Sequence, residues 1–390
     1  EASHDGGTVS NMTFAHGYTP TDAQIAALKA GFSLDDAALS NFSNGIGSTG
    51  WTYQVANAAV DFLGAGDSVE LTYVVTIDDG NGATVTQNVV VTVTGTSDAP
   101  TVTASENFVV NEQDLTNGNT DALIFTGDVG LNFIDYSSAG LSARLKTSGA
   151  IPLDPAGDLI LLKSDGVALG YSLLTRPSEG SQKLAAFKPT NGEIIFVLDL
   201  KIVSDGSGGF KVEYTFELRG NLDHIDAGVG DSMPLDFTVT AKNSAGETAS
   251  NTFTVTINDD TPDATDVAAT MEENTATLIS LVKGDGADVE AGETYVNGAD
   301  DATVTLGTPT FSNLPAGVVP GTPGISLVQT ATGYDVSITP GTAFDALADG
   351  ETLSMEIPFT VEDSDGDTVT KVISVTVTGT NDAPVIAAID

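Results

Sequence analysis

Acidic and amide side chains recur in three clusters whose residue types suit a divalent cation. The clusters are Asp78, Asp79 and Asn81 with Asp98; Asn258, Asp259 and Asp260 with Asp263; and Asp363, Asp365 and Asp367 with Asp382. Ca2+ takes roughly six to eight oxygen ligands from carboxylates, amides and carbonyls. The clusters therefore predict calcium sites, although a run such as Asp78–Asn81 alone is also typical of a plain hairpin turn.

Further acids follow the first two clusters. After the first come Glu106, Glu112 and Asp114, and after the second come Glu272, Glu273, Asp285 and Asp288. We expect a turn acid, a linker acid and an early acid of the next stretch to converge at each junction. Carboxylates packed together without a cation would repel one another strongly. The pattern thus predicts Ca2+ as the cofactor at the junctions.

The elements that position these acids repeat along the chain. Residues 62–100 and 346–384 align without a gap at a constant offset of 284 residues, so that Leu63 corresponds to Leu347. Both copies contain VTVTGT before an Asp-Ala-Pro. A more diverged copy covers 230–262. Such self-similarity is typical of arrays of similar modules. We therefore expect modules at 1–98, 101–262 and 263–384, with 385–390 starting another.

Each repeated segment reads as two strands and a turn. LTYVVTI and VTQNVVVTV are rich in β-branched residues and alternate with period two, and DDGNG or EDSDGD between the strands suits a tight turn. The exception is Thr21–Ala30, which has a cap at Thr21, apolar Ile25 and Leu28, and a stop at Gly31. The expected fold class is all-β, with tandem antiparallel β-sandwiches and one short helix.

Composition excludes several functions. The chain has 13 Lys and Arg against 54 Asp and Glu, a net charge of −41, and no cysteine. Binding to nucleic acid or to an anionic membrane surface is therefore not expected, whereas cations are favoured partners. Thiol chemistry and disulfides are excluded, and no apolar stretch is long enough to insert into a membrane. The sequence begins Glu1-Ala2-Ser3, without a Met or a signal peptide, so we expect it to be a piece of a longer protein.

The middle module differs from its neighbours. It spans 162 residues (101–262) and contains ten of the thirteen basic residues, including all three Arg. DLILLKS, KLAAFKP, GEIIFVLDLKIV and GFKVEYTFELRG predict extra strands. Elaborated loops on a scaffold often bind ligands, so we expect a ligand site here, with a Ca2+ held by Asp223, Asp226 and Asp231 as the candidate. The alternative is a larger spacer.

The first and third modules carry a family resemblance. GWTYQVANAAVDFLGAGDSVELTYVVTIDDGNGATVTQNVVVTVTGTSDAP and ALADGETLSMEIPFTVEDSDGDTVTKVISVTVTGTNDAPVI resemble the VCBS repeat of giant bacterial surface proteins. The middle module, with NEQDL, ELRGNLDHID and INDDTPDA, resembles another repeat of type I secreted RTX adhesins. The chain lacks the glycine-rich nonapeptides of such adhesins, so the resemblance implies an internal region.

The resemblance implies cadherin-like sandwiches stiffened by Ca2+, at the surface of a Gram-negative bacterium. Such adhesins attach cells to surfaces or hosts and support biofilms. Some carry sugar-binding modules or a peptide-binding module in which Ca2+ meets a terminal carboxylate. The implied partners are proteins, peptides or glycans on other cells and the neighbouring modules of the same chain.

Other motifs do not support an enzyme. Gly45–Gly50 matches GxGxxG but precedes a strand rather than a helix. The three His show no metal-ligand spacing, and Asp223–Asp226 is more typical of a turn or calcium loop than of acid–base catalysis. Trp51 and Tyr53 are expected in the core. Three hypotheses remain: a ligand-binding adhesin region, a pure extender, and, least favoured, a β-sandwich hydrolase.

Overall fold

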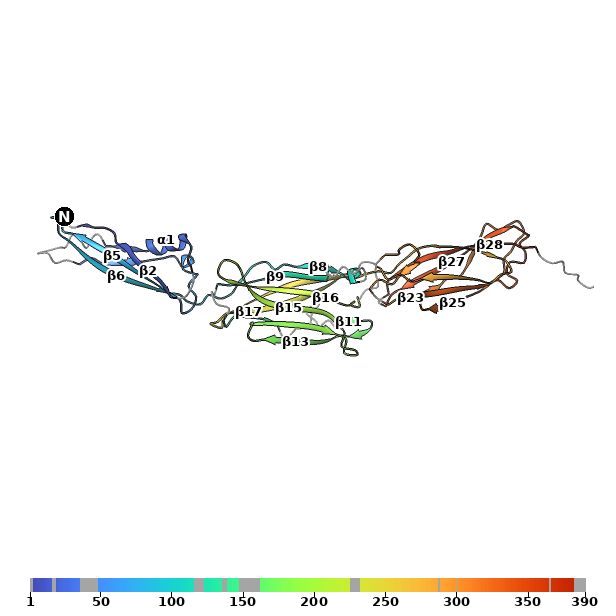
Figure 1. The fold of residues 1–390 in the computed structure, drawn as a ribbon, viewed down its shortest axis with the longest axis horizontal. Helices are drawn as coiled ribbons and strands as arrows, with labels where there is room; N and C mark the ends of the chain where they lie inside the picture. The colour runs from blue at the N-terminus through green and yellow to red at the C-terminus, as the bar shows by residue number, and fades with distance from the viewer. Residues whose placement is uncertain are drawn as a thin grey trace, which may run out of the picture.

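The chain forms three groups of β-strands that follow one another along a long axis (Figure 1). The computed structural model describes residues 3–15, 19–35, 48–115, 123–134, 139–146, 162–224, 232–286, 288–299, 301–364 and 366–381. We call the groups the first unit (β1–β6), the second unit (β7–β18) and the third unit (β19–β28). The expected all-β class with a single α-helix is confirmed. Within the described ranges, no helix has the length and apolarity needed to cross a membrane.

The first unit consists of one main sheet and a helix. Its elements are β1 (Ser3–His4), β2 (Thr8–Ala15), α1 (Asp22–Ala30), β3 (Phe32–Leu34), β4 (Trp51–Tyr53), η2 (Asn57–Ala59), β5 (Ser68–Asp78) and β6 (Thr84–Thr94). β5 pairs with β6 along one edge and with β2 and β1 along the other. The predicted helix is confirmed: Thr21 and Gln24 form a capping box, and Gly31 is the C-cap.

The aromatic residues of β4 differ from the expectation. Tyr53 is half-buried and its hydroxyl donates to the Leu28 carbonyl at 2.9 Å. Trp51, however, is 46% exposed and stacks on Phe32. The prediction of a buried Trp51 was wrong, because β3 and β4 form a separate two-stranded sheet at whose end Trp51 lies.

The second unit is a sandwich of a four-stranded and a six-stranded sheet. Its elements are β7 (Thr101–Val102), β8 (Phe108–Asn111), η3 (Glu112–Leu115), β9 (Ile124–Phe133), β10 (Ser142–Leu145), β11 (Lys163–Ser164), β12 (Val167–Ala168), β13 (Gly170–Arg176), β14 (Ser181–Phe187), β15 (Ile194–Ser204), β16 (Phe210–Leu218), β17 (Ser232–Lys242) and β18 (Thr248–Asn258). The sheet orders are β10-β17-β18-β8 and β13-β14-β15-β16-β9-β7. Three of the predicted extra strands are confirmed as β14, β15 and β16. The structure describes only residues 162–164 of the fourth segment, DLILLKS, and these contain the short strand β11.

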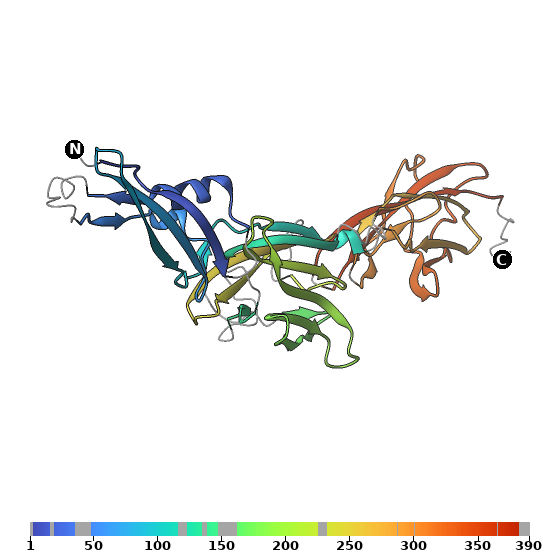
Figure 2. The ribbon, with the colours of Figure 1, turned by 60° about the vertical axis from the view of Figure 1, so that its left-hand side comes forward.

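The third unit pairs a five-stranded sheet with a three-stranded one. Its strands are β19 (Asp263–Ala264), β20 (Val267–Glu272), β21 (Thr277–Val282), β22 (Tyr295–Val296), β23 (Thr303–Leu306), β24 (Thr310–Ser312), β25 (Gly324–Thr330), β26 (Gly333–Thr339), β27 (Thr352–Glu362) and β28 (Thr368–Thr378). The larger sheet contains β20, β28, β27 and β23, with β24 also on β27, and the smaller runs β21-β26-β25. Figure 2 shows β27 and β28 on one side of this unit.

The sequence repeat corresponds to one hairpin in each unit. β5–β6, β17–β18 and β27–β28 each pair two eleven-residue strands along their whole length. In the second and third units a parallel strand covers the far edge of this hairpin: β8 lies beside β18, and β20 beside β28. The hairpins therefore form the common frame of the three units.

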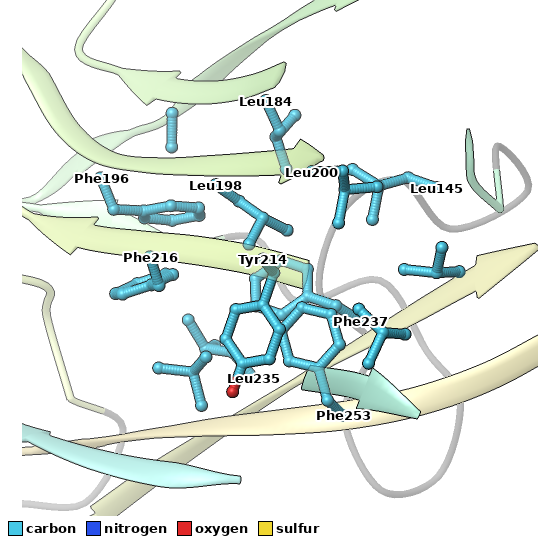
Figure 3. Packing of buried hydrophobic residues seen from close by; sticks show 14 of the residues in the cluster. Leu145, Leu184, Phe196, Leu198, Leu200, Tyr214, Phe216, Leu235, Phe237 and Phe253 are labelled. Carbon is cyan, nitrogen blue, oxygen red and sulfur yellow. The ribbon is translucent and has the colours of Figure 1, made fainter. Parts of the chain in front are cut away.

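Tyr214 lies at the centre of the second unit's core (Figure 3). Its ring stacks on Phe253 with 3.8 Å between centroids, and its hydroxyl donates to the Glu106 carbonyl. Burial raises the pKa of Tyr214 far above its ordinary value, so the phenol stays protonated and remains a donor.

Tyr214→Phe is expected to lower the free energy of unfolding by about 1 kcal/mol, because the part-buried hydrogen bond to the Glu106 carbonyl is lost. Tyr171→Phe is the matched control, since the Tyr171 hydroxyl is buried without a hydrogen-bond partner among the described residues. Removing that hydroxyl should be neutral or stabilising. Urea unfolding of both variants checks this, and equal losses would contradict the assignment.

Candidate metal centre

Glu112, His224 and Asp259 form a cluster at the end of the second unit. One ligand atom from each residue lies within 4.8 Å of the other two. Glu112 and His224 are buried, and Asp259 is half-buried. The sheet explains the meeting of Glu112 with Asp259. β8 and β18 are parallel with Asn111 beside Asn258, so the next residue of each strand leaves the sheet at the same point.

Hydrogen bonds fix this arrangement. The amide of Leu222 donates to Glu112 Oε1 at 2.7 Å, and the other carboxylate oxygen lies 3.4 Å from His224 Nε2. Predicted ligand Asn258 donates to Asn111 Oδ1 at 2.9 Å and ties the two strand ends together. Glu112 is thus held by the loop after β16, which also carries His224.

The donor set accommodates Ca2+ through its oxygens. Glu112 and Asp259 offer carboxylates, which are the ligands that Ca2+ prefers, whereas imidazole is a ligand of zinc-like ions. Glu112 and Asp259 would therefore hold Ca2+, with His224 beside them. Of these residues, the sequence predicted the two acids but not His224, because the three His show no regular spacing.

The linker between the second and third units divides its acids between them. Asp259 joins the cluster, while Asp260 is buried and accepts a hydrogen bond from the Ala299 amide. Asp263 accepts from the Ala264 amide at 2.8 Å and from the Val289 amide at 3.5 Å. Consecutive acids are therefore fixed to different units. This second linker, residues 259–262, is where the structure concentrates the predicted ligands.

A small pocket of about 240 Å³ lies beside the second linker, in the third unit. Predicted ligand Asp285 lines it with Asp301 and Lys283. Asp288 follows three residues later on the same loop, and its side chain is exposed. Asp285 therefore faces an open, partly cationic pocket rather than the Glu112 cluster.

Glu273 is the counterpart of Glu112 in the third unit. Like Glu112, it follows directly after the parallel edge strand and is fully buried. Its Oε1 accepts from the Thr380 amide at 2.6 Å and from the Thr380 hydroxyl at 2.9 Å. Its Oε2 is buried without a hydrogen-bond partner in the described ranges, which suits a cation ligand. Its neighbour Glu272 is exposed on the edge strand.

The turn acids hold hairpins together. Asp79, Asn243 and Asp363 each begin an equivalent turn, and each accepts a hydrogen bond from the amide four residues later, at 3.1, 2.8 and 2.7 Å. Asp205 accepts from the Gly209 amide in the same way at 2.9 Å. The hairpin-turn interpretation of DDGNG therefore has direct support. Backbone bonds from Asn81 and Ala83 lower the pKa of exposed Asp79.

The expected meeting of a module's turn acid with its own linker acid was wrong. In the first unit, Asp78 pairs with Thr84 at the end of the hairpin where the turn lies. At the opposite end Ser68 pairs with Thr94, and the chain continues from there to Asp98. Eleven residues of strand span about 37 Å, so Asp78, Asp79 and Asn81 lie far from Asp98.

The third unit has the same geometry at its turn. Asp363 and Asp367 are buried at the Glu362–Thr368 end of the hairpin. Asp365 and Asp382 lie outside the described residues.

The first linker, residues 95–100, meets the turn of the following unit instead. Asn243 Nδ2 donates to Ser97 Oγ and to the Asp98 carbonyl, both at 2.8 Å. Burial, together with the charges of Asp61 and Glu247, raises the pKa of the Asp98 carboxyl. Asp61 and Glu247 were not predicted, although Glu247 occupies the turn position that corresponds to Asp367. The three carboxylates form a second acidic group at a linker.

The remaining predicted ligands have structural roles or lie apart. Glu106 Oε2 accepts from the Asp128 amide at 2.9 Å and so helps to hold β9. Asp114 is half-buried in η3. Asp223 accepts from the Gly166 amide at 3.0 Å and closes the β11–β12 hairpin. Asp226 and Asp231 lie outside the described residues, so the predicted three-residue ligand loop is represented only by Asp223.

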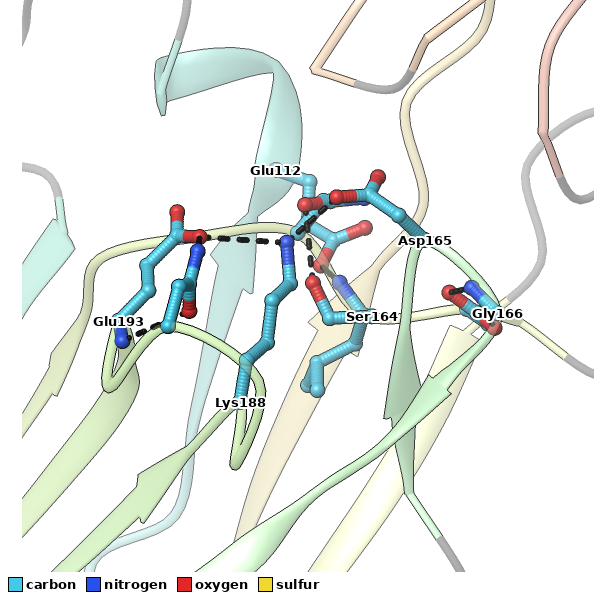
Figure 4. Close-up of polar contacts among 10 residues, drawn as sticks. Glu112, Ser164, Asp165, Gly166, Lys188 and Glu193 are labelled. Carbon is cyan, nitrogen blue, oxygen red and sulfur yellow. Dashed lines mark hydrogen bonds and ion pairs between the residues drawn. The ribbon is translucent and has the colours of Figure 1, made fainter.

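An ion pair between the buried Lys188 and the exposed Asp165 lies close to Glu112 (Figure 4). Lys188 Nζ contacts Asp165 Oδ2 and lies 3.4 Å from Glu193 Oε2. Asn221 Nδ2 donates to Asp165 Oδ1 at 2.9 Å, and Asn221 Oδ1 accepts from Ser164 Oγ at 3.1 Å. Burial raises the pKa of Asp165, but the bonds from Lys188 and Asn221 outweigh this and place its pKa below the ordinary value.

Lys188→Met is expected to lower the free energy of unfolding by about 1 kcal/mol at pH 7, a small value because Asp165 is partly exposed to screening solvent. The pKa of Asp165 is lower in the folded protein than in the unfolded chain, where it is about 4. The Asp165 carboxylate therefore stabilises the fold at pH values above about 4, and this stabilisation is lost as the pH falls through the folded-state pKa. The cost should therefore shrink below about pH 4. Lys201→Met, on an exposed residue of β15, is the control, and denaturant unfolding at pH 7 and pH 3 provides the measurement.

Comparisons with known proteins give structural matches only. No family model matches the chain, and no curated protein matches it. Among solved structures, mouse clustered protocadherin PcdhgC3 EC1-3 is similar at 13% identity and TM-score 0.31, covering 91% of each chain. Human CDH23 EC21-23 is similar at 14% identity and TM-score 0.28, covering 97% of this chain and 88% of that one. At these low TM-scores the matches carry no conclusion about function.

Proposed function

We propose that the chain is a calcium-stiffened segment of a large secreted bacterial surface adhesin rather than an enzyme. The observation that supports this most directly is the second linker, where Glu112, Asp259 and Asp260 come from both sides of one short connection. Modules bounded at 1–98, 101–262 and 263–384 would then be joined by Ca2+-dependent links. The resemblance to VCBS and RTX adhesin repeats supplies the cell-surface setting and the role in attachment and biofilms.

Ca2+ bound at the linkers would oppose bending between units. Glu112 and Asp259 approach from the second unit, and Asp260 is anchored in the third. A cation shared by these carboxylates would relieve their repulsion and couple the two units. The charge of −41 adds repulsion that the bound cations would partly cancel.

Small-angle X-ray scattering should show a larger maximum dimension in Ca2+ than in a chelator, because Ca2+-bound linkers hold the units in line. Mg2+ at the same concentration is the control, since it demands a tighter octahedral geometry. Equal dimensions in Ca2+ and chelator would contradict the proposal of Ca2+-stiffened linkers.

We also place the ligand site in the second unit. An open pocket of about 490 Å³ is lined by Leu141, Ser142, Arg144 and Ser178, among others. Arg144 donates to the Ser181 carbonyl at 3.2 Å, which holds the guanidinium at the pocket wall. A guanidinium is suited to a carboxylate, as found at a peptide C-terminus or on an acidic sugar.

The pocket can be tested with immobilised C-terminal peptides and glycans, probed with the full chain in Ca2+ and in chelator. Arg144→Gln should abolish the signal, and Lys201→Met should leave it unchanged. Binding that survives Arg144→Gln would exclude this pocket. Absence of any binding would favour the extender role, in which the three units supply only length and stiffness.

A further inference from the structure

The outer edge of β6 in the first unit differs from the equivalent edges of the other two units. β18 carries the parallel strand β8, and β28 carries the parallel strand β20. β6 pairs with β5 on one side, and within the described ranges no strand pairs with its other side. The first unit therefore presents an open edge where its two repeats present a closed one.

The two closed edges share one register. Val110 lies beside Ile257 in the second unit, and Met271 lies beside Val377 in the third. Ile257 and Val377 correspond to each other, since β18 and β28 each occupy the same eleven positions of the hairpin. In both units a fully buried glutamate, Glu112 or Glu273, follows directly after the parallel strand.

The exposed fractions of the inward-facing side chains show that β6 lacks the neighbouring strand that buries the equivalent positions of β18 and β28. Phe253, Val255 and Ile257 are each 0% exposed, and Ile373, Val375 and Val377 are at most 1% exposed. Their counterparts on β6 are Val89, Val91 and Val93. Val91 is 8% exposed, and Val89 and Val93 are only half-buried. Val90, on the other face of β6, is 53% exposed.

We infer that residues 89–94 of β6 are a docking site for one parallel β-strand. The occupant is a strand with two inward apolar residues followed by an inward glutamate, as in Phe108-Val110-Glu112 and Ala269-Met271-Glu273. β8 and β20 each precede the hairpin that they cover, so the repeat itself supplies the occupant: a strand with the residue pattern of β20, as in residues 266–274. Its glutamate would reach residues 95–98 at the first linker.

Strand addition explains why one more strand would stabilise the first unit. An added strand satisfies the open backbone groups of β6, and its apolar side chains cover half-buried valines. Among the residues that the structure describes, the buried core of the first unit contains nine, fewer than in either neighbour. The strand would enlarge this core without altering the hairpin.

The test grafts residues 266–274 of the chain itself (DVAATMEEN) onto the N-terminus of the full chain. β6 spans about 37 Å, so a Gly/Ser linker of about 20 residues lets the graft run parallel to β6 and return to Ser3. Tethering raises the effective concentration to about the millimolar range. Hydrogen exchange and the melting of the first unit are measured on the grafted and ungrafted chains.

The graft should slow amide exchange at residues 89–94 at least about tenfold and raise the melting temperature of the first unit. A matched graft with Ala269→Pro and Thr270→Pro should do neither, because one of two adjacent residues must face β6 and proline cannot donate. Unchanged exchange in the DVAATMEEN graft, an equal effect of the proline graft, or slow exchange of 89–94 in the ungrafted chain would each overturn the inference.

Discussion

Adding 10 mM Ca2+ to chelator-treated protein is expected to raise the melting temperature of the second and third units by many degrees. Extracellular calcium sites have dissociation constants of about 10⁻⁴–10⁻³ M, so 10 mM is about ten to a hundred times that value. Each site then adds about 1.4–2.7 kcal/mol to the free energy of unfolding. For a unit of this size, each kcal/mol corresponds to about 2–8 °C. Calorimetry in Ca2+ and in chelator measures the shift directly.

The same experiment identifies the ligand. Glu112→Gln keeps an oxygen for the Leu222 amide but removes the charge, so the Ca2+-induced shift of the second unit should fall while the chelated protein stays folded. Glu356→Gln, on an exposed residue of β27, is the matched control and should leave the shift unchanged. Melting curves that are identical in Ca2+ and chelator would rule out structural calcium, and a normal shift in Glu112→Gln would rule out this ligand.

The fold was largely predictable because its signals are local. Period-two alternation in LTYVVTI and VTQNVVVTV defines β5 and β6 without reference to the rest of the chain. The helix at Asp22–Ala30 was equally readable, since Thr21, Gln24 and Gly31 act within one or two turns. Trp51 was misjudged because its exposure depends on β3 and β4 forming a separate sheet.

The candidate metal ligands were predicted only in part because they depend on which strand ends meet. Glu112 and Asp259 converge because β8 and β18 are parallel, which the sequence repeat does not state. Asp79 and Asp98 were grouped together because they flank one hairpin, yet that hairpin separates them by its full length. Counting strand residues would have corrected this, and would have placed the turn residue Glu247 near the preceding linker. His224 carries no such signal.

Gly298→Ala is expected to produce a large loss of stability from a single added methyl group. Gly298 has a φ of +80°, and a Cβ there would lie 1.6 Å from Asp260 Oδ2. The buried Asp260 carboxylate would have to move away from the Ala299 amide, which anchors the second linker to the third unit. Losing a hydrogen bond to a buried charge and adding positive-φ strain should together cost about 2–4 kcal/mol.

Gly292→Ala is the matched control, because Gly292 has a φ of +100° with no atom within 4 Å of its Cβ position. It should show only the backbone strain, about 1 kcal/mol. Urea unfolding of the third unit measures both losses, and the calcium-induced melting shift should fall in Gly298→Ala but not in Gly292→Ala. Equal losses in the two variants would mean that Asp260 does not anchor the linker. The anchor matters because Asp259 is the adjacent residue: once Asp260 is displaced, the geometry that presents Asp259 to Glu112 is no longer fixed from the third unit.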